Sequence, residues 1–404
     1  MLEDIRVLDL TDESGWLAGK ILGDIGLDVI AVEPPGGHPG RRRPPRVGAA
    51  EDPEGSVAWF ALGTGRRGIT LDLERPRGRE LLLRLVETAD VLLESAPPGE
   101  MAARGLGFED LRRRNPRLVH CAITPFGQSG PRSEWRGGDL VVVAMGGNMM
   151  LTGYPDRPPV RCSNPTAFIH GGPEAALAVL MALAAREEDG RGRFVDVSLH
   201  ETQLQTHLSY AGQYALHRRM PVREGDRLGG MREIWRARDG YVSFGLRGGP
   251  ARVANLKATV AWMEECGMAP DWLRDYDFDS YNHNTLSPEE LARFEEAFAA
   301  FFETRTMREL YDEAVRRRIF LAPCNDAAAL LDHPQLRARE FFTEVEHPAL
   351  GRPVELPGFF ARTSEDDVRI RRPAPRVGEH NEEVFGGIGI GPAELRELRE
   401  EGVV

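Results

Sequence analysis

Short apolar runs alternate with helix-like segments from residue 5 to residue 123, and this alternation limits the possible folds more than any other feature. Residues 5–10 and 28–32 have the composition of strands, and the segment between them has helical spacing. Strand, helix and strand in this order make a βαβ unit, and strands that are apolar throughout are typical of a parallel sheet covered on both faces. The pattern continues with a helix at 80–89, a strand at 90–93, a short helix at 108–114 and a strand at 117–123. The sequence therefore predicts an α/β fold.

Two polar and proline-containing loops come directly after predicted strands. Residues 94–99 follow one strand and residues 124–128 follow another. In open parallel sheets, ligands generally bind beyond the carboxyl ends of the strands. We therefore expect a binding site at the edge of the sheet where these loops lie.

An apolar segment at residues 174–186 predicts a helix that is apolar all round and therefore buried. Pro173 suits the first turn of a helix, so we expect the helix to begin there. Residues 164–170, which include Phe168 and His170, would then form a loop that leads from the core to the helix N-terminus. Because helix N-termini favour anions and reactive carbonyl groups, this loop is a candidate site.

The length of 404 residues favours two domains. Residues 221–231 are rich in glycine, arginine and proline, which indicates a boundary. Further strands and helices follow up to about residue 325, and the chain then returns to turns, short strands and a C-terminal helix. We expect a large domain from residues 1–220, a smaller domain at 221–325, and a return of residues 326–404 to the large domain.

Charge and composition argue against several classes of partner. Fifty-one basic and 63 acidic residues give a net charge of −12, which disfavours nucleic acid and anionic membranes. The chain has neither an uninterrupted apolar run near the roughly 20 residues of a membrane span nor a leader-like start, so we expect a cytoplasmic protein. The cysteines, which lie far apart without the spacing of a zinc site, are expected to be reduced thiols, and no metal site is expected: Cys121, Cys162, Cys266 and Cys324.

Arginine clusters could bind phosphate groups within this acidic chain. Residues 41–43 are three consecutive arginines, and Arg66 and Arg67 lie on a glycine-rich turn; both clusters could equally be solvated surface charge. The glycines at 63–68 match the spacing of a dinucleotide-binding fingerprint. We reject that interpretation because a strand, rather than a helix, is predicted directly after them.

Motifs of nucleophile-elbow hydrolases, metalloproteases, P-loop proteins and kinases are absent from the sequence. His170 could act as a general base, although a single histidine beside two glycines is more often structural. Asp139 follows two glycines and is best explained as a helix cap.

Several longer segments carry a family likeness that extends over nearly the whole chain. They read LGDIGLDVIAVEPPGG, RRGITLDLERPRGRELLLRLVETADVLLES, GLGFEDLRRRNPRLVHCAITPFGQSGP, DGRGRFVDVSL, DHPQLRARE and RVGEHNEEV. On these segments the chain resembles the class III CoA-transferases. The resemblance implies a Rossmann-like large domain built from both ends of the chain, a smaller α+β domain, and an interlocked homodimer or heterodimer. It also implies a CoA thioester and a carboxylic acid as substrates, with no bound cofactor.

Site residues of that family can be carried over only in part. Its acyl-accepting aspartate lies in a loop that matches residues 167–172, and Phe168 stands where the aspartate belongs. A phenyl ring cannot form an acyl anhydride with a substrate. The family asparagine and a later basic residue are replaced by Ser95 and Pro97, and Gly138 replaces a histidine of the related racemases. The resemblance implies CoA contacts for the following residues: Arg41, Arg66, Arg67 and, at the replaced asparagine position, Ser95.

Three functions remain open at this point. The chain could be an acyl-CoA-binding subunit without its own nucleophile, paired with an aspartate-bearing paralogue, as in enzymes similar to benzylsuccinate CoA-transferase. It could instead be an acyl-CoA enzyme with another mechanism, such as direct transfer, isomerisation or elimination, using His170. It could also be a CoA-thioester binder without enzymatic activity.

Overall fold

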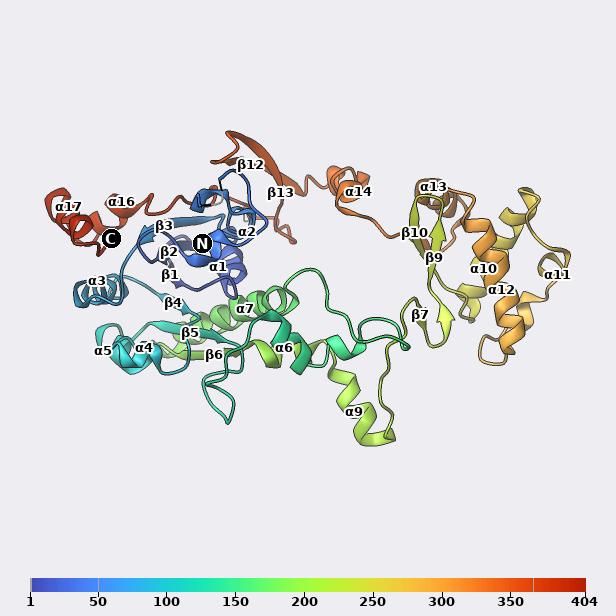
Figure 1. Ribbon diagram of the computed structural model, residues 1–404, viewed down its shortest axis with the longest axis horizontal. Helices are drawn as coiled ribbons and strands as arrows, with labels where there is room; N and C mark the ends of the chain where they lie inside the picture. Colours follow the sequence, from blue (N-terminus) through green and yellow to red (C-terminus); the bar gives the residue numbers. More distant parts are fainter. Residues whose placement is uncertain (1, 50, 366) are drawn as a thin grey trace. The chain divides into compact units, whose positions relative to one another are not determined.

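The computed structural model describes residues 2–49, 51–365 and 367–404, and the chain divides into two compact units (Figure 1). Unit 1 contains residues 1–149, 161–220 and 334–404, and unit 2 contains residues 150–160 and 221–333. We expected boundaries after residues 220 and 325, and the two units meet after residues 220 and 333. Residues 150–160, which we placed in the large domain, fall in unit 2.

Unit 1 is built on a six-stranded sheet in which every neighbouring pair of strands is parallel. Its order is β3-β2-β1-β4-β5-β6, with these bounds: β1 Arg6–Leu10, β2 Asp28–Glu33, β3 Arg66–Thr70, β4 Val91–Glu94, β5 Val119–Thr124 and β6 Phe194–Ser198. The predicted α/β fold with a parallel sheet is confirmed. From β1 the chain builds outward through β2 and β3, then returns to add β4 on the other side of β1. The strand order therefore reverses between β1 and β4, which makes this the topological switch point of the sheet.

Helices cover both faces of this sheet, as the apolar strands predict (Figure 1). Successive residues of β1 point to opposite faces: Val7 packs in one core cluster and Leu8 in the other. The face of Leu8 is covered by α3 (Pro76–Val86), α4 (Glu100–Ala103), α5 (Phe108–Arg114), α16 (Asn381–Gly386) and α17 (Pro392–Glu400). The face of Val7 is covered by α1 (Trp16–Asp24), α6 (Asp139–Met145), α7 (Thr166–Asp189) and α8 (Leu199–Gln205).

Helix α7 begins at Thr166 rather than at Pro173, so the predicted loop at residues 164–170 is wrong for most of its length. The two glycines that we took to lead into the helix lie inside it and serve packing. A β-carbon on Gly171 would lie 2.2 Å from Leu199 Cδ2, and one on Gly172 would lie 2.7 Å from Leu17 Cβ. Only glycine lets α7 approach α8 and α1 this closely. Pro173 lies inside the helix, where it cannot donate the hydrogen bond to the carbonyl four residues earlier.

One side of α7 is exposed, which corrects the expectation that this apolar helix is buried all round. Ala175, Val179 and Leu183 lie in the core, whereas Leu177 and Met181 are 55% and 64% exposed. By length and composition α7 could also cross a membrane, and 44% of its most apolar window is buried in the protein. Its packing against α1, α6, α8, β5 and β6 accounts for this composition without a membrane.

The remaining elements of unit 1 include α2 (Val57–Leu62), α9 (Leu208–His217), α15 (Pro334–Ala338) and a hairpin of β12 (Phe342–His347) and β13 (Arg352–Pro357). α8 and α9 are two separate helices. Arg66 and Arg67 begin β3 instead of lying on a turn.

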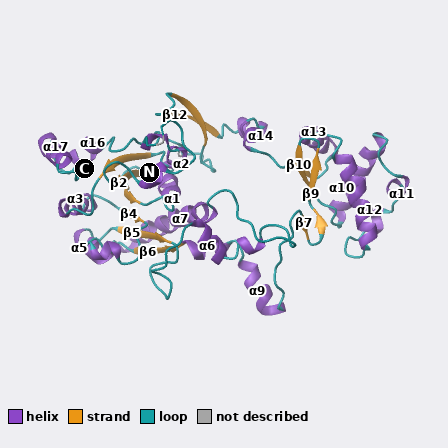
Figure 2. Ribbon diagram, viewed as in Figure 1, coloured by secondary structure: helices purple, strands orange, loops and turns teal. Residues whose placement is uncertain are grey.

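Unit 2 has a three-stranded antiparallel sheet beside a group of helices (Figure 2). The sheet order is β11-β10-β9, and the elements are β7 (Arg227–Leu228), β8 (Met231–Arg232), β9 (Ile234–Ala237), β10 (Gly240–Phe244), α10 (Pro250–Glu265), α11 (Asp271–Arg274), α12 (Pro288–Phe302), α13 (Met307–Arg317), β11 (Leu321–Pro323) and α14 (Ala327–Leu331). Its core is rich in aromatic rings, including Trp235, Phe244 and Phe298. Unit 2 therefore has a hydrophobic core of its own.

Candidate functional site

A cavity of about 820 Å³ lies in unit 1 at the carboxyl ends of β1, β4 and β5. Its walls come from the loops that follow these strands, with Asp12 after β1, Ser95 after β4 and Pro125 after β5. Both loops that we selected from the sequence, at 94–99 and 124–128, contribute residues to it. Because β1 and β4 flank the switch point, the cavity occupies the place where open parallel sheets bind ligands.

Hydrogen bonds hold the two loops at the switch point together. The Asp12 backbone N–H donates to Ser95 Oγ at 2.8 Å, and Asp12 Oδ1 accepts the Ser14 N–H at 2.9 Å. On the other loop, Glu94 Oε2 accepts the Ala96 N–H at 2.6 Å. Side chains therefore fix both turns, and Ser95 lines the cavity as a hydroxyl group that is already held in place.

Phe168 lines the cavity from the first turn of α7. Its ring packs against the core cluster that contains Ile123 and Leu199, and both of these buried residues also line the cavity. The sequence placed Phe168 at a helix start near the core, and the structure places it in the wall of the largest cavity described. The core residues that its ring packs against are apolar.

His170 is absent from the described lining of this cavity. It lies near His207, whose pKa is lowered by burial and, to a smaller extent, by the positive charge that His170 can carry. The ring of His207 stacks on Tyr210 at 5.3 Å between centroids. The structure therefore brings His170 together with another histidine rather than with Phe168 and Ser95.

Asp139 connects two of the helices beside the cavity. Its Oδ1 atom accepts the backbone N–H of Ala167 at 2.7 Å, and Ala167 is the second residue of α7. Asp139 begins α6 without capping it, so the cap expected from the sequence is not formed there; its carboxylate instead accepts a backbone N–H in the first turn of α7. The carboxylate also lines the cavity and fixes the backbone next to Phe168.

Arg41 and Arg66 are completely buried and engaged by carboxylates. Arg41 binds Glu33 through Nε at 2.7 Å and Nη2 at 2.6 Å, and lies over the Trp59 ring at 4.2 Å. Arg66 pairs with Asp9 at 3.0 Å; burial lowers the pKa of its guanidinium and the charge of Asp9 opposes this shift. Both guanidinium groups thus face protein partners in this structure.

Arg67 is mostly buried, with Nη2 at 2.5 Å from Asp28 and Nη1 at 2.7 Å from Glu383. The described residues that line the cavity include neither Arg67 nor the two buried arginines. A CoA contact by Arg41, Arg66 or Arg67 stays a prediction from the resemblance.

Three other arginines line the cavity: Arg43, Arg136 and Arg161. Arg43 forms an ion pair with Glu13, whereas Arg136 and Arg161 form none with the residues that the structure describes. Sequence reasoning missed Arg136 and Arg161. The one available signal was their position, since Arg136 stands just before the two glycines that precede Asp139.

A second cavity, of about 210 Å³, shares Asp12 and Ser95 with the first. Arg104 and the buried Glu94 also line it. The free Glu94 oxygen Oε1 lies 3.7 Å from Nε2 of the buried His120. The two cavities therefore adjoin at the switch point.

No group of three or more His, Cys, Asp or Glu side chains is arranged to hold a metal ion in the described part of the chain. The cysteines form no disulfide in the structure. Cys121 is buried, and burial raises the pKa of its thiol, whereas Cys162, Cys266 and Cys324 are exposed.

Comparison with known proteins places this site in a family. Residues 2–381 match the profile of a family described as CoA-transferase family III. Succinyl-CoA:(R)-benzylsuccinate CoA-transferase subunit BbsE of Thauera aromatica is 32% identical over 400 residues, covering 99% of this chain and 97% of that protein. Succinate-glutarate CoA-transferase of Agrobacterium fabrum is 29% identical over 398 residues, covering 95% and 94%. The crystal structure of a CAIB/BAIF family protein from Brucella suis aligns with a TM-score of 0.79 and 27% identity, over 95% of this chain and 98% of that one.

These matches extend over both units and include the residues of the switch-point cavity. The profile and the benzylsuccinate relative each cover far more than half of the chain, so the resemblance in the sequence is confirmed at the level of the family. The chain belongs to CoA-transferase family III.

Proposed function

We propose that the chain binds an acyl-CoA thioester as a subunit of an enzyme that transfers CoA between carboxylic acids. In this subunit the nucleophile position is occupied by Phe168, and the reacting aspartate comes from a paralogous partner. The observation that carries this proposal is the position of Phe168, which lines a switch-point cavity with apolar neighbours.

The chemistry of transfer requires a nucleophile that Phe168 lacks. In the family mechanism a carboxylate attacks the thioester carbonyl, an acyl anhydride forms and CoA leaves as the thiolate. The thiolate then attacks the enzyme carbonyl of the anhydride, which releases the first acid and leaves an enzyme-CoA thioester. The second acid attacks this thioester, and the returning thiolate cleaves the new anhydride to give the second acyl-CoA and the free carboxylate. Four of the five carboxylates that line the cavity are engaged by the protein: Asp12 holds its own turn, Asp139 accepts an N–H of α7, Glu13 pairs with Arg43 and Glu100 pairs with Arg104. The fifth, Glu134, is exposed and forms no ion pair among the described residues. Since none of them stands at position 168, the arrangement supports a binding subunit rather than a complete catalytic one.

The substrates that we propose are a CoA thioester and a dicarboxylic acid. Relatives carry names with succinate, glutarate, mesaconate, citramalate and malate, all of which are dicarboxylic acids. Arg136 and Arg161 line the main cavity, and among the described residues neither has a carboxylate partner. A guanidinium group in that state suits the free carboxylate of a half-thioester. The adjoining cavity beside Ser95 and Arg104 would accommodate part of the CoA.

The exposed side of α7 supports a partner chain. Ile169, Leu177 and Met181 recur at helical spacing and are exposed, so they form an apolar stripe. Two relatives are named as subunits, the BbsE subunit and a beta subunit of a malate CoA-transferase. We propose that an aspartate-bearing paralogue covers this stripe in an interlocked heterodimer. A homodimer would cover it equally well but would contain no aspartate at position 168.

The alternative mechanism through His170 has no geometric support, because His170 is absent from the described lining of the cavity. Activity measurements separate the remaining functions. The chain should be purified alone and after co-expression with a paralogue that carries the aspartate, and both preparations assayed for CoA transfer from succinyl-CoA to dicarboxylic acids. We expect transfer only in the co-expressed preparation.

Two results would contradict the proposal. Transfer by the chain alone would show that it has its own nucleophile. If calorimetry detects no binding of CoA, the assignment of CoA as the ligand is wrong. Phe168→Asp serves as the matched variant. If the pocket is otherwise intact, the introduced carboxyl should form an acyl adduct that hydroxylamine releases, while Phe320→Asp, at an exposed phenylalanine in unit 2, should form none.

A further inference from the structure

We infer that the switch-point cavity selects an acyl-CoA whose acyl chain carries a bulky apolar substituent, an aryl or branched alkyl group, with Phe168 as its contact surface. This inference rests on the proposed function, because it assumes that the ligand is an acyl-CoA. It adds the type of acyl group, which we infer from the side chains that line the cavity.

Part of the cavity wall is apolar, although Thr124 and Asp139 also line the cavity. Phe168 packs on the core, and Ile123 and Leu199, which are both buried, line the cavity beside it. A small hydrophilic acyl group placed there would lose water without gaining a polar partner from these side chains. An apolar group would exchange water for contacts with a ring and two branched aliphatic side chains.

Two large apolar side chains of the cavity lining are also exposed to solvent. Trp135 is 52% exposed and Leu140 is 54% exposed, and both line this cavity. Scattered exposed apolar residues are normal on a protein surface, but here they share one cavity with Phe168. The ligand that covers them therefore gains apolar contact area on more than one side.

One aromatic ring and one guanidinium group pack against Trp135. Phe126 meets it edge-on at 6.3 Å between centroids, and Arg132 lies 4.8 Å from its ring centre. An indole that is supported in this way can pack on a ligand with little loss of side-chain freedom. The arrangement thus resembles a preformed binding surface.

Calorimetry with three probes tests the inference: CoA, propionyl-CoA and 3-phenylpropionyl-CoA, titrated into the chain together with its partner if one is required. Propionyl-CoA and 3-phenylpropionyl-CoA differ by a phenyl group alone. Burying that group should tighten binding by roughly tenfold or more relative to propionyl-CoA. The ratio of the two dissociation constants is the readout, because the CoA portion cancels in it.

Trp135→Ala should reduce this ratio by about threefold or more, since about half of the indole is already exposed and its loss should leave the fold intact. Phe168→Ala should reduce it further, and Phe168→Leu should keep most of it. Phe320→Ala is the matched control, because Phe320 is an exposed ring in unit 2. It should leave the ratio unchanged.

The outcomes distinguish this inference from the proposed function. If CoA binds but the two acyl-CoA probes bind equally, the apolar substituent site is wrong and CoA binding stands. A ratio that is the same in Trp135→Ala as in the unaltered protein would also overturn the inference, because the preference would then arise elsewhere. If none of the probes binds, both the inference and the proposed function are wrong.

Discussion

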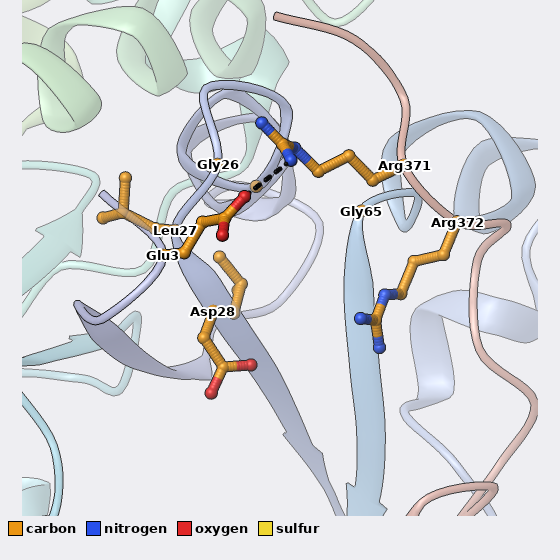
Figure 3. Close-up of a pocket in the computed structure, with 9 residues that line it drawn as sticks. Glu3, Gly26, Leu27, Asp28, Gly65, Arg371 and Arg372 are labelled. Carbon is orange, nitrogen blue, oxygen red and sulfur yellow. Dashed lines mark hydrogen bonds and ion pairs between the residues drawn. The ribbon is translucent and has the colours of Figure 1, made fainter. Parts of the chain in front are cut away.

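The two edges of the parallel sheet hold their charged side chains in different states. At the carboxyl edge, Arg136 and Arg161 line the large cavity without carboxylate partners among the described residues. At the amino edge, a smaller cavity of about 360 Å³ lies beside Glu3, Asp28 and Arg371 (Figure 3). There, Arg371 pairs with Glu3 at 3.0 Å.

Asp28, at the start of β2, is shared between Arg6 at 3.1 Å and Arg67 at 2.5 Å. Glu3, Asp28 and Arg371 at the amino edge therefore have charged partners. Arg372 in the same cavity forms no ion pair among the described residues, and Arg136 and Arg161 of the carboxyl-edge cavity form none either. An arginine cluster in the sequence does not by itself indicate a binding site. What decides is the edge of the sheet at which the arginine emerges, and whether the fold has already supplied a carboxylate.

The largest expected effect concerns a buried arginine. Arg66→Ala removes the partner of Asp9, which is itself buried, and leaves that carboxylate without its counter-charge. Removing one partner of a buried ion pair is expected to lower the free energy of unfolding by about 3–5 kcal/mol. Urea unfolding followed by circular dichroism measures this change.

Arg75→Ala is the control for that experiment, because Arg75 pairs with Asp72 at the surface and is 52% exposed. Its loss should cost less than about 1 kcal/mol. If the Arg66→Ala protein folds with nearly full stability but binds CoA more weakly, Arg66 is a ligand contact after all. The distinction between buried structural arginines and available ones would then be wrong.

Much of this organisation was predictable, because buried parallel strands have a strong local signature. Continuous apolar runs predicted the sheet, and the polar loops after Glu94 and Thr124 predicted the edge that carries the cavity. The start of α7 was not predictable in the same way. Gly171 and Gly172 look like a helix lead-in, and their close contacts with Leu199 and Leu17 depend on tertiary packing.

The sequence also could not predict which arginines have carboxylate partners. Arg67 pairs with Glu383, near the other end of the chain, and Arg66 pairs with Asp9 in a different strand. No local sequence pattern predicts ion pairs between residues so far apart in the chain. For the same reason Arg136 and Arg161 could not be separated from the many surface arginines until the fold placed them at the cavity.

An intermediate effect is expected from matched arginine variants at the two edges. Arg136→Gln should raise the KM for a dicarboxylic acid roughly tenfold, because a charge-assisted hydrogen bond contributes about 1.5–3 kcal/mol. Arg371→Gln at the amino edge should leave the KM unchanged. Steady-state kinetics of the active complex measure both, and equal effects of the two variants would remove the functional difference between the edges.

The smallest effect is a pH dependence that should separate stability from binding. Burial lowers the pKa of His347 below its ordinary value of 6.5, its Nδ1 accepts the Ala349 N–H, and its ring lies 4.2 Å from that of Phe60. The unfolded chain therefore binds a proton at His347 more readily than the folded chain does. Stability should fall as the pH drops through 6.5 towards the lowered pKa of the folded state, and it should be fully retained above 6.5.

His347→Phe should flatten this dependence when urea unfolding is compared at about pH 7.5 and about pH 5.5. The described residues that line the main cavity include no histidine, so the preference for phenylpropionyl-CoA over propionyl-CoA should stay constant over the same range. The assignment of the pH dependence to His347 would be wrong if two results were found together. The preference for phenylpropionyl-CoA would change with pH, and His347→Phe would leave the pH dependence of the stability unaltered. The titrating group would then belong to the binding site rather than to the fold.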